Sequence, residues 1–248
     1  MLRSTKEIIG YPLKATDGEI GECKDFLFDD RNWVTRYMVA DTGGWLNTER
    51  VLISPLSLGK PDWALGRFPV DLTMEMIRNA PPLEEEMPVS RQYETALYDH
   101  YDYPYYWVGQ SLWGPGATPR QLREYVKGAP PSSNPLETGD PNLRSVIEVT
   151  GYHISAQDGE VGHIEEFILD DETWSIRYFV IDTRNWLPGK KVLLSPIWME
   201  DIDWKKKTAS VALEQDRIKN SPEYEPKAPV NRTYEARLYD FYGRPTYW

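Results

Sequence analysis

The chain of 248 residues has one cysteine, Cys23, and three histidines. One thiol cannot form an intrachain disulfide, and a metal site needs several ligands that converge. The sequence also contains no CxxC spacing, no Gly-rich phosphate loop and no nucleophile elbow. We therefore expect no metal site, no cofactor and no catalytic residues.

Long apolar runs and an excess of positive charge are missing as well. No segment approaches the roughly 18 apolar residues of a membrane span. The N-terminal residues 1–7 carry charge before the apolar core of a signal peptide could form, so we expect a cytoplasmic protein. The 28 Lys and Arg residues face 39 Asp and Glu residues, for a net charge of −11. This balance argues against nucleic acid as a partner, because nucleic-acid binding shows a basic footprint.

The dominant feature that is present is an internal duplication. Residues 1–107 align with residues 142–248 at a constant offset of 141 positions without a gap, and 46 of the 107 aligned positions are identical. Asp17-Gly18-Glu19, for example, returns as Asp158-Gly159-Glu160. A copy of this length has the size of one folding unit, which is far above the period of solenoid repeats.

The sequence thus predicts two domains and a connector. The domains are expected at 1–107 and 142–248, and the connector at 108–141 is rich in Gly, Pro and Ser. Within it, Thr118-Pro119 before a helical interval and Gly128 after it predict one short helix near 118–127. The rest of the connector is expected to be extended.

Each copy contains short β-prone runs separated by turn signals. In the first copy we expect strands at 8–13, 19–28, 34–40, within 45–53 and at 65–72. Helices are expected from Thr73, and from Ser90 to about Tyr101. This pattern predicts a mainly β fold with short helices, of the α+β class. The architecture expected is two tandem small antiparallel barrels, each followed by two short helices and an aromatic tail.

One combination of motifs is similar to a known family. Gly-Tyr, Asp-Gly-Glu-x-Gly, an acidic turn, Arg-Tyr-x-Val-x-Asp-Thr and Val-Leu-x-Ser-Pro follow one another from Gly10 to Leu72, and again from Gly151 to Leu213. This succession resembles the PRC-barrel domain of the photosynthetic reaction centre H subunit and of a ribosome-maturation factor. The resemblance implies a small β-barrel that contacts other proteins, and it implies no catalytic residues.

Two acidic pairs, Asp29-Asp30 and Asp170-Asp171, are the first candidates for chemistry. Both pairs fall in predicted turns, where Asp side chains bond nearby backbone amides. Paired catalytic carboxylates lie across a cleft, which adjacent residues do not establish. We interpret both pairs as structural.

The aromatic tails are the least ordinary feature of the sequence, because large amphipathic rings suit docking surfaces. Three readings stay open: docking of each tail on a barrel of this chain, a surface for a partner, or stacking on a sugar or single-stranded nucleic acid. The candidate interaction or tail-docking residues are Tyr98, Tyr101, Tyr106, Trp107, Tyr239, Tyr242, Tyr247 and Trp248.

Together these observations predict a non-enzymatic soluble adaptor or assembly module that contacts a protein partner. One alternative is a peripheral factor of a photosynthetic reaction centre or of ribosome maturation. Another is a hydrolase-type enzyme with an acidic cleft between the domains. Pairing of the two repeats, a homodimer and peripheral association with a membrane are also left open.

Overall fold

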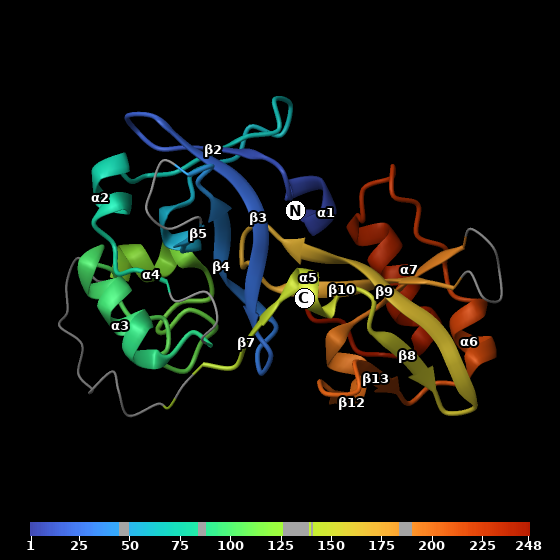
Figure 1. The fold of residues 1–248 in the computed structure, drawn as a ribbon. Helices are drawn as coiled ribbons and strands as arrows, with labels where there is room; N and C mark the ends of the chain where they lie inside the picture. The colour runs from blue at the N-terminus through green and yellow to red at the C-terminus, as the bar shows by residue number, and fades with distance from the viewer. Residues whose placement is uncertain (45–49, 84–87, 126–138, 140, 184–189) are drawn as a thin grey trace. The chain divides into compact units, whose positions relative to one another are not determined.

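A computed structural model describes residues 1–248 except 45–49, 84–87, 126–138, 140 and 184–189. The protein is an α+β structure, mostly β, with two sheets and short helices, which confirms the predicted class (Figure 1).

The first sheet is organised around one long strand. β3 pairs with β4 along one edge, and with β2 and β7 along the other edge. The strands of this sheet, in the order β5-β4-β3-β2-β6 with β7 beside β3, are β2 (Pro12–Lys14), β3 (Glu19–Asp29), β4 (Val34–Asp41), β5 (Arg50–Ile53), β6 (Phe68–Pro69) and β7 (Leu143–Ser145).

Short helices lie on one side of β3, β4 and β5 in Figure 1. They are α2 (Met74–Arg78), α3 (Arg91–His100) and α4 (Pro119–Tyr125), and η1 (Pro55–Ser57) is a single 3-10 turn. The predicted N-caps are confirmed: the hydroxyl of Thr73 accepts from the Met76 amide, and that of Ser90 accepts from the Tyr93 amide, both at 3.1 Å. Because a cap satisfies amides that the first turn leaves open, these helix starts were readable in the sequence.

The second sheet repeats this plan, with β9 as its long strand. Its order is β11-β10-β9-β8-β13-β12, with β1 beside β9. Its strands are β1 (Leu2–Ser4), β8 (His153–Ala156), β9 (Gly159–Asp170), β10 (Ile176–Asp182), β11 (Lys191–Leu194), β12 (Met199–Asp203) and β13 (Thr208–Val211). The remaining helical segments are α1 (Thr5–Ile8), α5 (Val146–Val149), η3 (Pro196–Trp198), α6 (Gln215–Lys219) and α7 (Arg232–Tyr242).

The compact units of the structure cross the repeat boundaries. One unit, which we call the amino unit, comprises Glu7–Ser145 and Glu172–Ser175. The other, the carboxy unit, comprises Met1–Lys6, Val146–Asp171 and Ile176–Trp248. Each unit therefore contains one repeat together with short segments of the other repeat, and the described connector residues belong to the amino unit.

The exchanged segments complete the two sheets. β1 pairs with β9 in the carboxy unit, and β7 pairs with β3 in the amino unit. The turn residue Trp174 also enters the amino unit, where its ring lies 6.4 Å from the rings of Phe26 and Phe68 and is 6% exposed.

Three details differ from the sequence-based expectations. The strand expected at 65–72 is reduced to the two residues of β6, Phe68–Pro69. The strand expected at 8–13 is shorter, because residues up to Ile8 form α1 and strand β2 begins only at Pro12. The sheets are also not wholly antiparallel, since β2–β6 and β8–β13 are parallel pairs. These strands are joined by long crossovers rather than hairpins, so no tight turn forces them to run in opposite directions. The hydrogen-bonded order of the described strands has two ends in each sheet, and the closed barrel stays a prediction.

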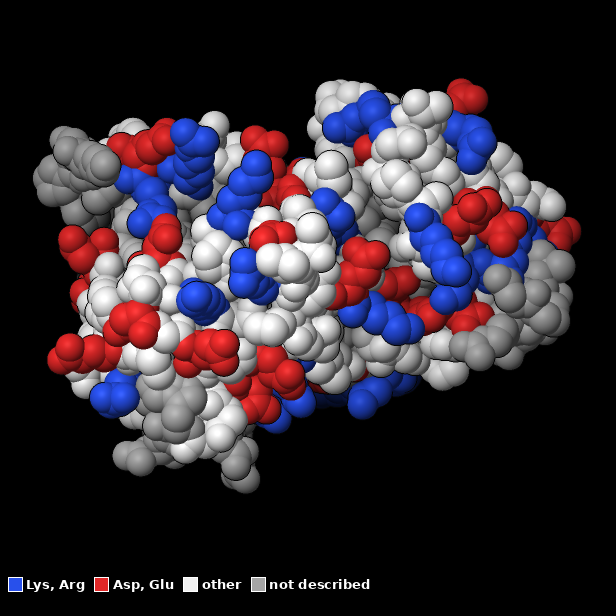
Figure 2. Space-filling model, turned by 90° about the horizontal axis from the view of Figure 1, so that it is seen from above, with Lys and Arg blue, Asp and Glu red and all other residues white. Residues whose placement is uncertain are grey.

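None of the helices that the structure describes is long and apolar enough to cross a membrane. On the face shown in Figure 2, Lys and Arg alternate with Asp and Glu among the described residues, without a uniformly basic area.

Candidate functional site: an arginine pocket in the amino unit

The aromatic tails pack mainly inside their own units. In the amino unit Tyr98, Tyr101 and Tyr106 are buried and Trp107 is half-buried. In the carboxy unit Tyr239 and Tyr242 are buried, Tyr247 is half-buried and Trp248 is 46% exposed. Most of these rings are thus part of the core, and Trp248 is the one with the largest exposed share.

Tyr98 on α3 is the centre of the first tail. Its ring lies 5.1 Å from that of Trp107 and 5.8 Å from that of Tyr106, at the tilted and edge-on angles that aromatic pairs favour. The chain after α3 therefore turns back over the helix that precedes it, and this return brings Tyr106 to the polar groups of the sheet.

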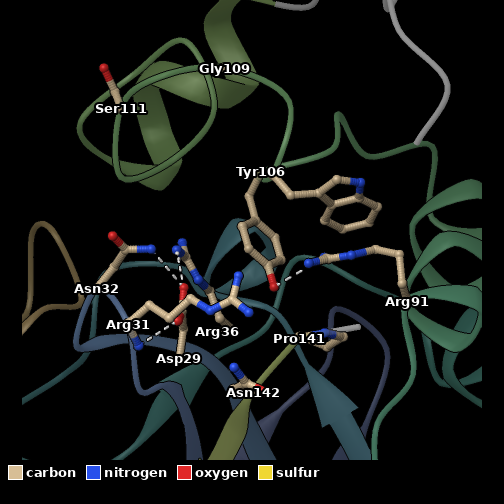
Figure 3. A pocket seen from close by; sticks show the side chains of 11 residues that line it. Asp29, Arg31, Asn32, Arg36, Arg91, Tyr106, Gly109, Ser111, Pro141 and Asn142 are labelled. Atoms are coloured by element: carbon tan, nitrogen blue, oxygen red, sulfur yellow. Dashed lines mark hydrogen bonds and ion pairs between the residues drawn. The ribbon is translucent and has the colours of Figure 1, made fainter. Parts of the chain in front are cut away.

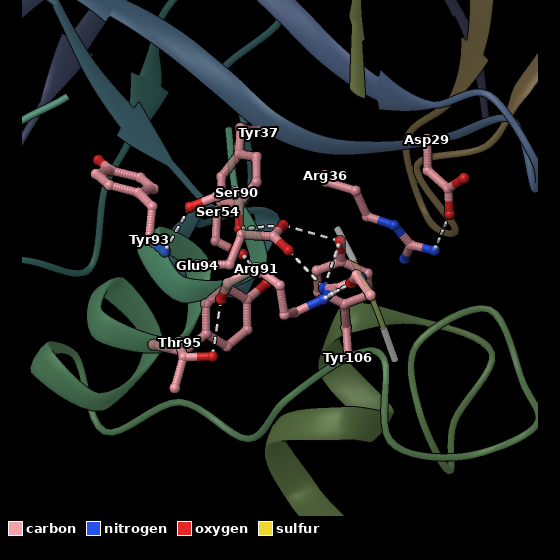
Figure 4. A network of polar contacts seen from close by, with 12 residues as sticks. Asp29, Arg36, Tyr37, Ser54, Ser90, Arg91, Tyr93, Glu94, Thr95 and Tyr106 are labelled. Carbon is pink, nitrogen blue, oxygen red and sulfur yellow. Dashed lines mark hydrogen bonds and ion pairs between the residues drawn. The ribbon is translucent and has the colours of Figure 1, made fainter. Parts of the chain in front are cut away.

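A buried carboxylate organises these polar groups (Figure 4). Glu94 is fully buried on α3 and accepts from the hydroxyls of Tyr37 at 2.8 Å and Tyr106 at 2.9 Å. Arg91, one turn earlier on the helix, forms a 2.5 Å ion pair with it. Burial raises the pKa of Glu94, and the nearby charge of Arg91 and the two hydroxyls only partly oppose this rise. The network anchors the tail to both the helix and the sheet.

The carboxy unit repeats this network. Glu235 accepts from Tyr178 and from Tyr247, each at 2.7 Å, and pairs with Arg232 at 3.1 Å. Exposure differs, because the side chain of Arg232 is 55% exposed whereas that of Arg91 is 9% exposed. The repeated part of the network thus serves tail docking in both units, and only the amino unit encloses its arginine.

Arg36 on β4 is a second enclosed arginine. Its Nη1 donates to the Leu112 carbonyl at 2.6 Å, and its Nη2 donates to Asp29 at 3.2 Å. The guanidinium carbon lies 4.0 Å from the ring centre of Tyr106 and 5.0 Å from that of Trp113. Its buried Nε has no hydrogen-bond partner among the described residues. The side chain is 3% exposed, so the rings and hydrogen bonds fix the plane of a positive group.

Arg36 and Arg91 line one pocket together with a third arginine, Arg31 (Figure 3). The cavity has a volume of about 190 Å³. Its lining residues are Asp29, Arg31, Asn32, Arg36, Arg91, Tyr106, Trp107, Gly109, Ser111, Pro141 and Asn142. The wall therefore combines the turn after β3, the start of α3, the tail, the connector and the residues that precede β7.

The pocket is electropositive. Three arginines line it, and Asp29 is the one carboxylate among the lining residues. Burial alone would raise the pKa of Asp29, but hydrogen bonds from Asn32 and Arg31 and the charge of Arg36 outweigh it and lower the pKa. Asp29 is therefore ionised near neutral pH and pairs with Arg36, while Glu94, behind the wall, pairs with Arg91, so the excess positive charge is that of Arg31. The remaining excess favours an anion, in a chain that is acidic overall.

The second repeat lacks parts of this pocket. Arg36 and Arg91 return as Arg177 and Arg232, but Glu172 stands at the position of Arg31. The connector residues Gly109 and Ser111, which complete the wall, belong to the amino unit. The arginine pocket is thus a feature of the amino unit.

Sequence reasoning did not select these residues. Arg91 is far from Arg31 and Arg36 in the sequence, and the connector was expected to be extended rather than part of a wall. One signal in the sequence pointed to a difference between the copies. Arg36 and Arg91 are repeated near tyrosines in the second copy, whereas an acidic residue replaces Arg31 there.

Another cavity of about 240 Å³ in the amino unit is lined by apolar side chains together with Arg50 and Arg78. Leu52, Ile77, Leu97 and Tyr101 contribute to its wall. Among the residues that the structure describes, no group of three or more His, Cys, Asp or Glu side chains is placed to hold a metal ion.

No protein-family model matches this chain, and no curated protein sequence matches it either.

Proposed function

We propose that this chain is a non-enzymatic adaptor or assembly protein built from two PRC-like domains. Its arginine pocket anchors a carboxylate group of a protein partner, either an Asp or Glu side chain or a chain terminus. The observation that carries the proposal is the convergence of Arg31, Arg36 and Arg91 on one small cavity.

The chemistry of the wall supports a planar oxyanion. A guanidinium presents its donors in a fork that matches a carboxylate, and charge-assisted pairs of this kind are stronger than neutral hydrogen bonds. Arg36 and Arg91 are held against aromatic rings, with Arg91 4.3 Å from the ring centre of Trp107. Little side-chain entropy is therefore left to lose when an anion binds.

The size of the cavity favours a group on a larger molecule. Pockets for complete small ligands usually enclose about 300–1,000 Å³, and this cavity is smaller at about 190 Å³. It accommodates the end of a side chain or of a chain, while the rest of the partner stays outside. This argues for protein recognition rather than for enclosure of a metabolite.

The arginine pocket itself does not supply the carboxylate pair of a hydrolase. A carboxylate pair would need an acid and a base that are free to exchange protons with substrate. Asp29 is instead engaged by Asn32 and Arg36. A reaction centre and a ribosome both supply protein surfaces, so a peripheral role on either is a special case of the adaptor proposal.

The test is affinity capture with matched charge variants, followed by mass spectrometry. Arg31→Glu places the acidic residue of the second repeat into the pocket. Arg120→Glu, on α4 with its side chain 88% exposed, makes the same charge change outside the pocket. We expect a stoichiometric partner to bind the wild type and the Arg120 variant, to be lost with the Arg31 variant, and to be released by millimolar glutarate.

Two results would contradict the proposal. One is a partner that binds the Arg31 variant as well as the wild type. The other is a partner that glutarate does not displace, because such a partner does not use a carboxylate in the pocket. Melting temperatures of both variants provide the folding control.

A further inference from the structure

The amino-terminal strand β1 is held in the carboxy unit by a small set of contacts. Three register pairs join it to β9: Leu2 with Asp170, Arg3 with Leu169 and Ser4 with Ile168. The chain then passes into the amino unit between Lys6 and Glu7. A strand of three residues therefore accounts for the pairing between this end of the chain and β9.

Side chains add specificity to this docking. The hydroxyl of Ser4 donates to Glu166, and that of Thr5 donates to the Phe167 carbonyl at 3.3 Å. Arg3 lies 4.0 Å from Asp171 in the acidic turn. The amino group of Met1 and the ammonium group of Lys6 add ion pairs with Asp171 and Glu165. The strand is therefore recognised through backbone pairing, two hydroxyl bonds and contacts of basic groups with an acidic edge.

β7 pairs with β3 through contacts equivalent to those between β1 and β9. Leu143, Arg144 and Ser145 pair with Asp29, Phe28 and Leu27. Ser145 donates to Asp25 at 2.5 Å, and Arg144 lies 3.0 Å from Asp30. The tripeptide Leu-Arg-Ser thus occurs twice in the chain, and each time it completes the sheet of the other repeat. Its partners, an acidic strand residue and an acidic turn, also occur twice.

This contact is confined to the start of the chain. Releasing the first six residues breaks the three-residue ladder, the ion pairs of Met1 and Lys6 and the hydroxyl bonds of Ser4 and Thr5. It leaves the other strand pairs of each sheet in place, so it is a local opening rather than global unfolding. Opening exposes backbone donors and acceptors along the end of β9, and an open strand edge is a template for another strand. Exchange of identical elements between copies is a low-cost route to dimers.

We propose that a second copy of this chain supplies its Leu2–Ser4 strand to β9, so that two chains exchange their amino-terminal strands reciprocally. The occupant is a second copy because the matching tripeptide is part of this sequence, and the structure shows it seated on this kind of edge in both units. This inference is independent of the arginine pocket and of its ligand.

The experiment places the two halves of the contact on different chains. One full-length chain carries Ser4→Cys, and a second chain, distinguished by a C-terminal tag, carries Glu166→Cys. The chains are mixed, opened briefly in sub-denaturing urea, returned to buffer and oxidised. The natural thiol of Cys23 is present in all samples; it is fully buried, and burial raises its pKa, so it reacts slowly in the folded protein.

A matched control replaces the second chain with one that carries Glu200→Cys, at an exposed position on β12 away from the β1 docking edge. We expect several-fold more disulfide-linked heterodimer with the Glu166 variant than with this control. A single chain that carries both Ser4→Cys and Glu166→Cys, oxidised before concentration, is expected to stay monomeric by light scattering. The reduced chain is expected to form dimers that increase with concentration.

Equal heterodimer yields with Glu166→Cys and Glu200→Cys would overturn the proposal, because random collision would then explain both. Dimerisation of the oxidised double variant to the same extent as the reduced chain would also overturn it. In that case the association would not need a free amino-terminal strand.

Discussion

The burial of Trp113 makes the role of the connector testable. This residue lies in the segment 108–141 that the sequence indicated to be mostly extended, yet its side chain is fully buried in the amino unit. Its indole N–H donates to the Thr173 carbonyl at 2.8 Å, and its ring lies 6.0 Å from that of Tyr106. The change Trp113→Ala therefore removes a core residue of the unit.

The expected loss can be worked from this burial. A buried Trp covers about 150–250 Å², which at about 25 cal/mol per Å² gives an upper limit of roughly 4–6 kcal/mol. Measured large-to-small changes at buried Trp cost about 3–5 kcal/mol. We expect the free energy of unfolding of the amino unit to fall by about 4 kcal/mol and its melting temperature to fall by roughly 10–20 °C.

Calorimetry is the assay, because two compact units are expected to give two transitions and only one should move. Trp248→Ala is the control: that side chain is 46% exposed, and its loss should cost less than about 2 kcal/mol. Unchanged transitions in the Trp113 variant would refute the reasoning, since they would mean that the connector does not contribute to the core.

Two further predictions concern the first repeat. Gly21→Ala should destabilise the amino unit by more than about 3 kcal/mol, because Gly21 has φ +141° and an added methyl would lie 1.8 Å from the Asp41 carbonyl oxygen. Gly43→Ala, at φ +61° with open space around it, should cost only about 1 kcal/mol in urea unfolding. The pKa of Asp29 is lowered from 3.8, so its contribution is present above pH 3.8 and is lost as the pH falls through the folded value. Asp29→Asn should therefore flatten the acid limb of the urea midpoint against pH, and an unchanged limb would contradict this assignment.

The helix starts could be predicted from the sequence because their causes are local. Thr73 and Ser90 each accept from an amide three residues later, so the cap and its helix lie in one short window. The long strand β3 was also predictable, since its β-prone run is continuous and ends at an acidic turn.

The exchange of short segments between the two repeats could not be predicted, because each segment would find chemically equivalent partners in its own repeat. Each repeat begins with a Leu-Arg-Ser strand. This strand finds an acidic strand residue and an acidic turn whether it pairs with β3 or with β9. Trp33 and Trp174 likewise occupy the same turn with almost the same φ, 56° and 59°. Yet Trp33 stacks on Phe28 of its own repeat, whereas Trp174 packs in the amino unit. The local sequence pattern therefore does not distinguish these pairings.

The duplication separates the structural part of the site from the part that we assign to recognition. Glu94 and Glu235 hold tyrosines and arginines in the same arrangement, so this network is explained by the docking of each tail on its own unit. Arg31 and the connector wall occur in the amino unit alone. If the pocket binds a carboxylate, changes at Arg31 should alter binding with little effect on melting. A change at Glu94 should lower the stability of the amino unit and a change at Glu235 that of the carboxy unit, since a buried tyrosine then loses its acceptor. A selective site thus requires only a few unrepeated residues on a framework that both copies need in order to fold.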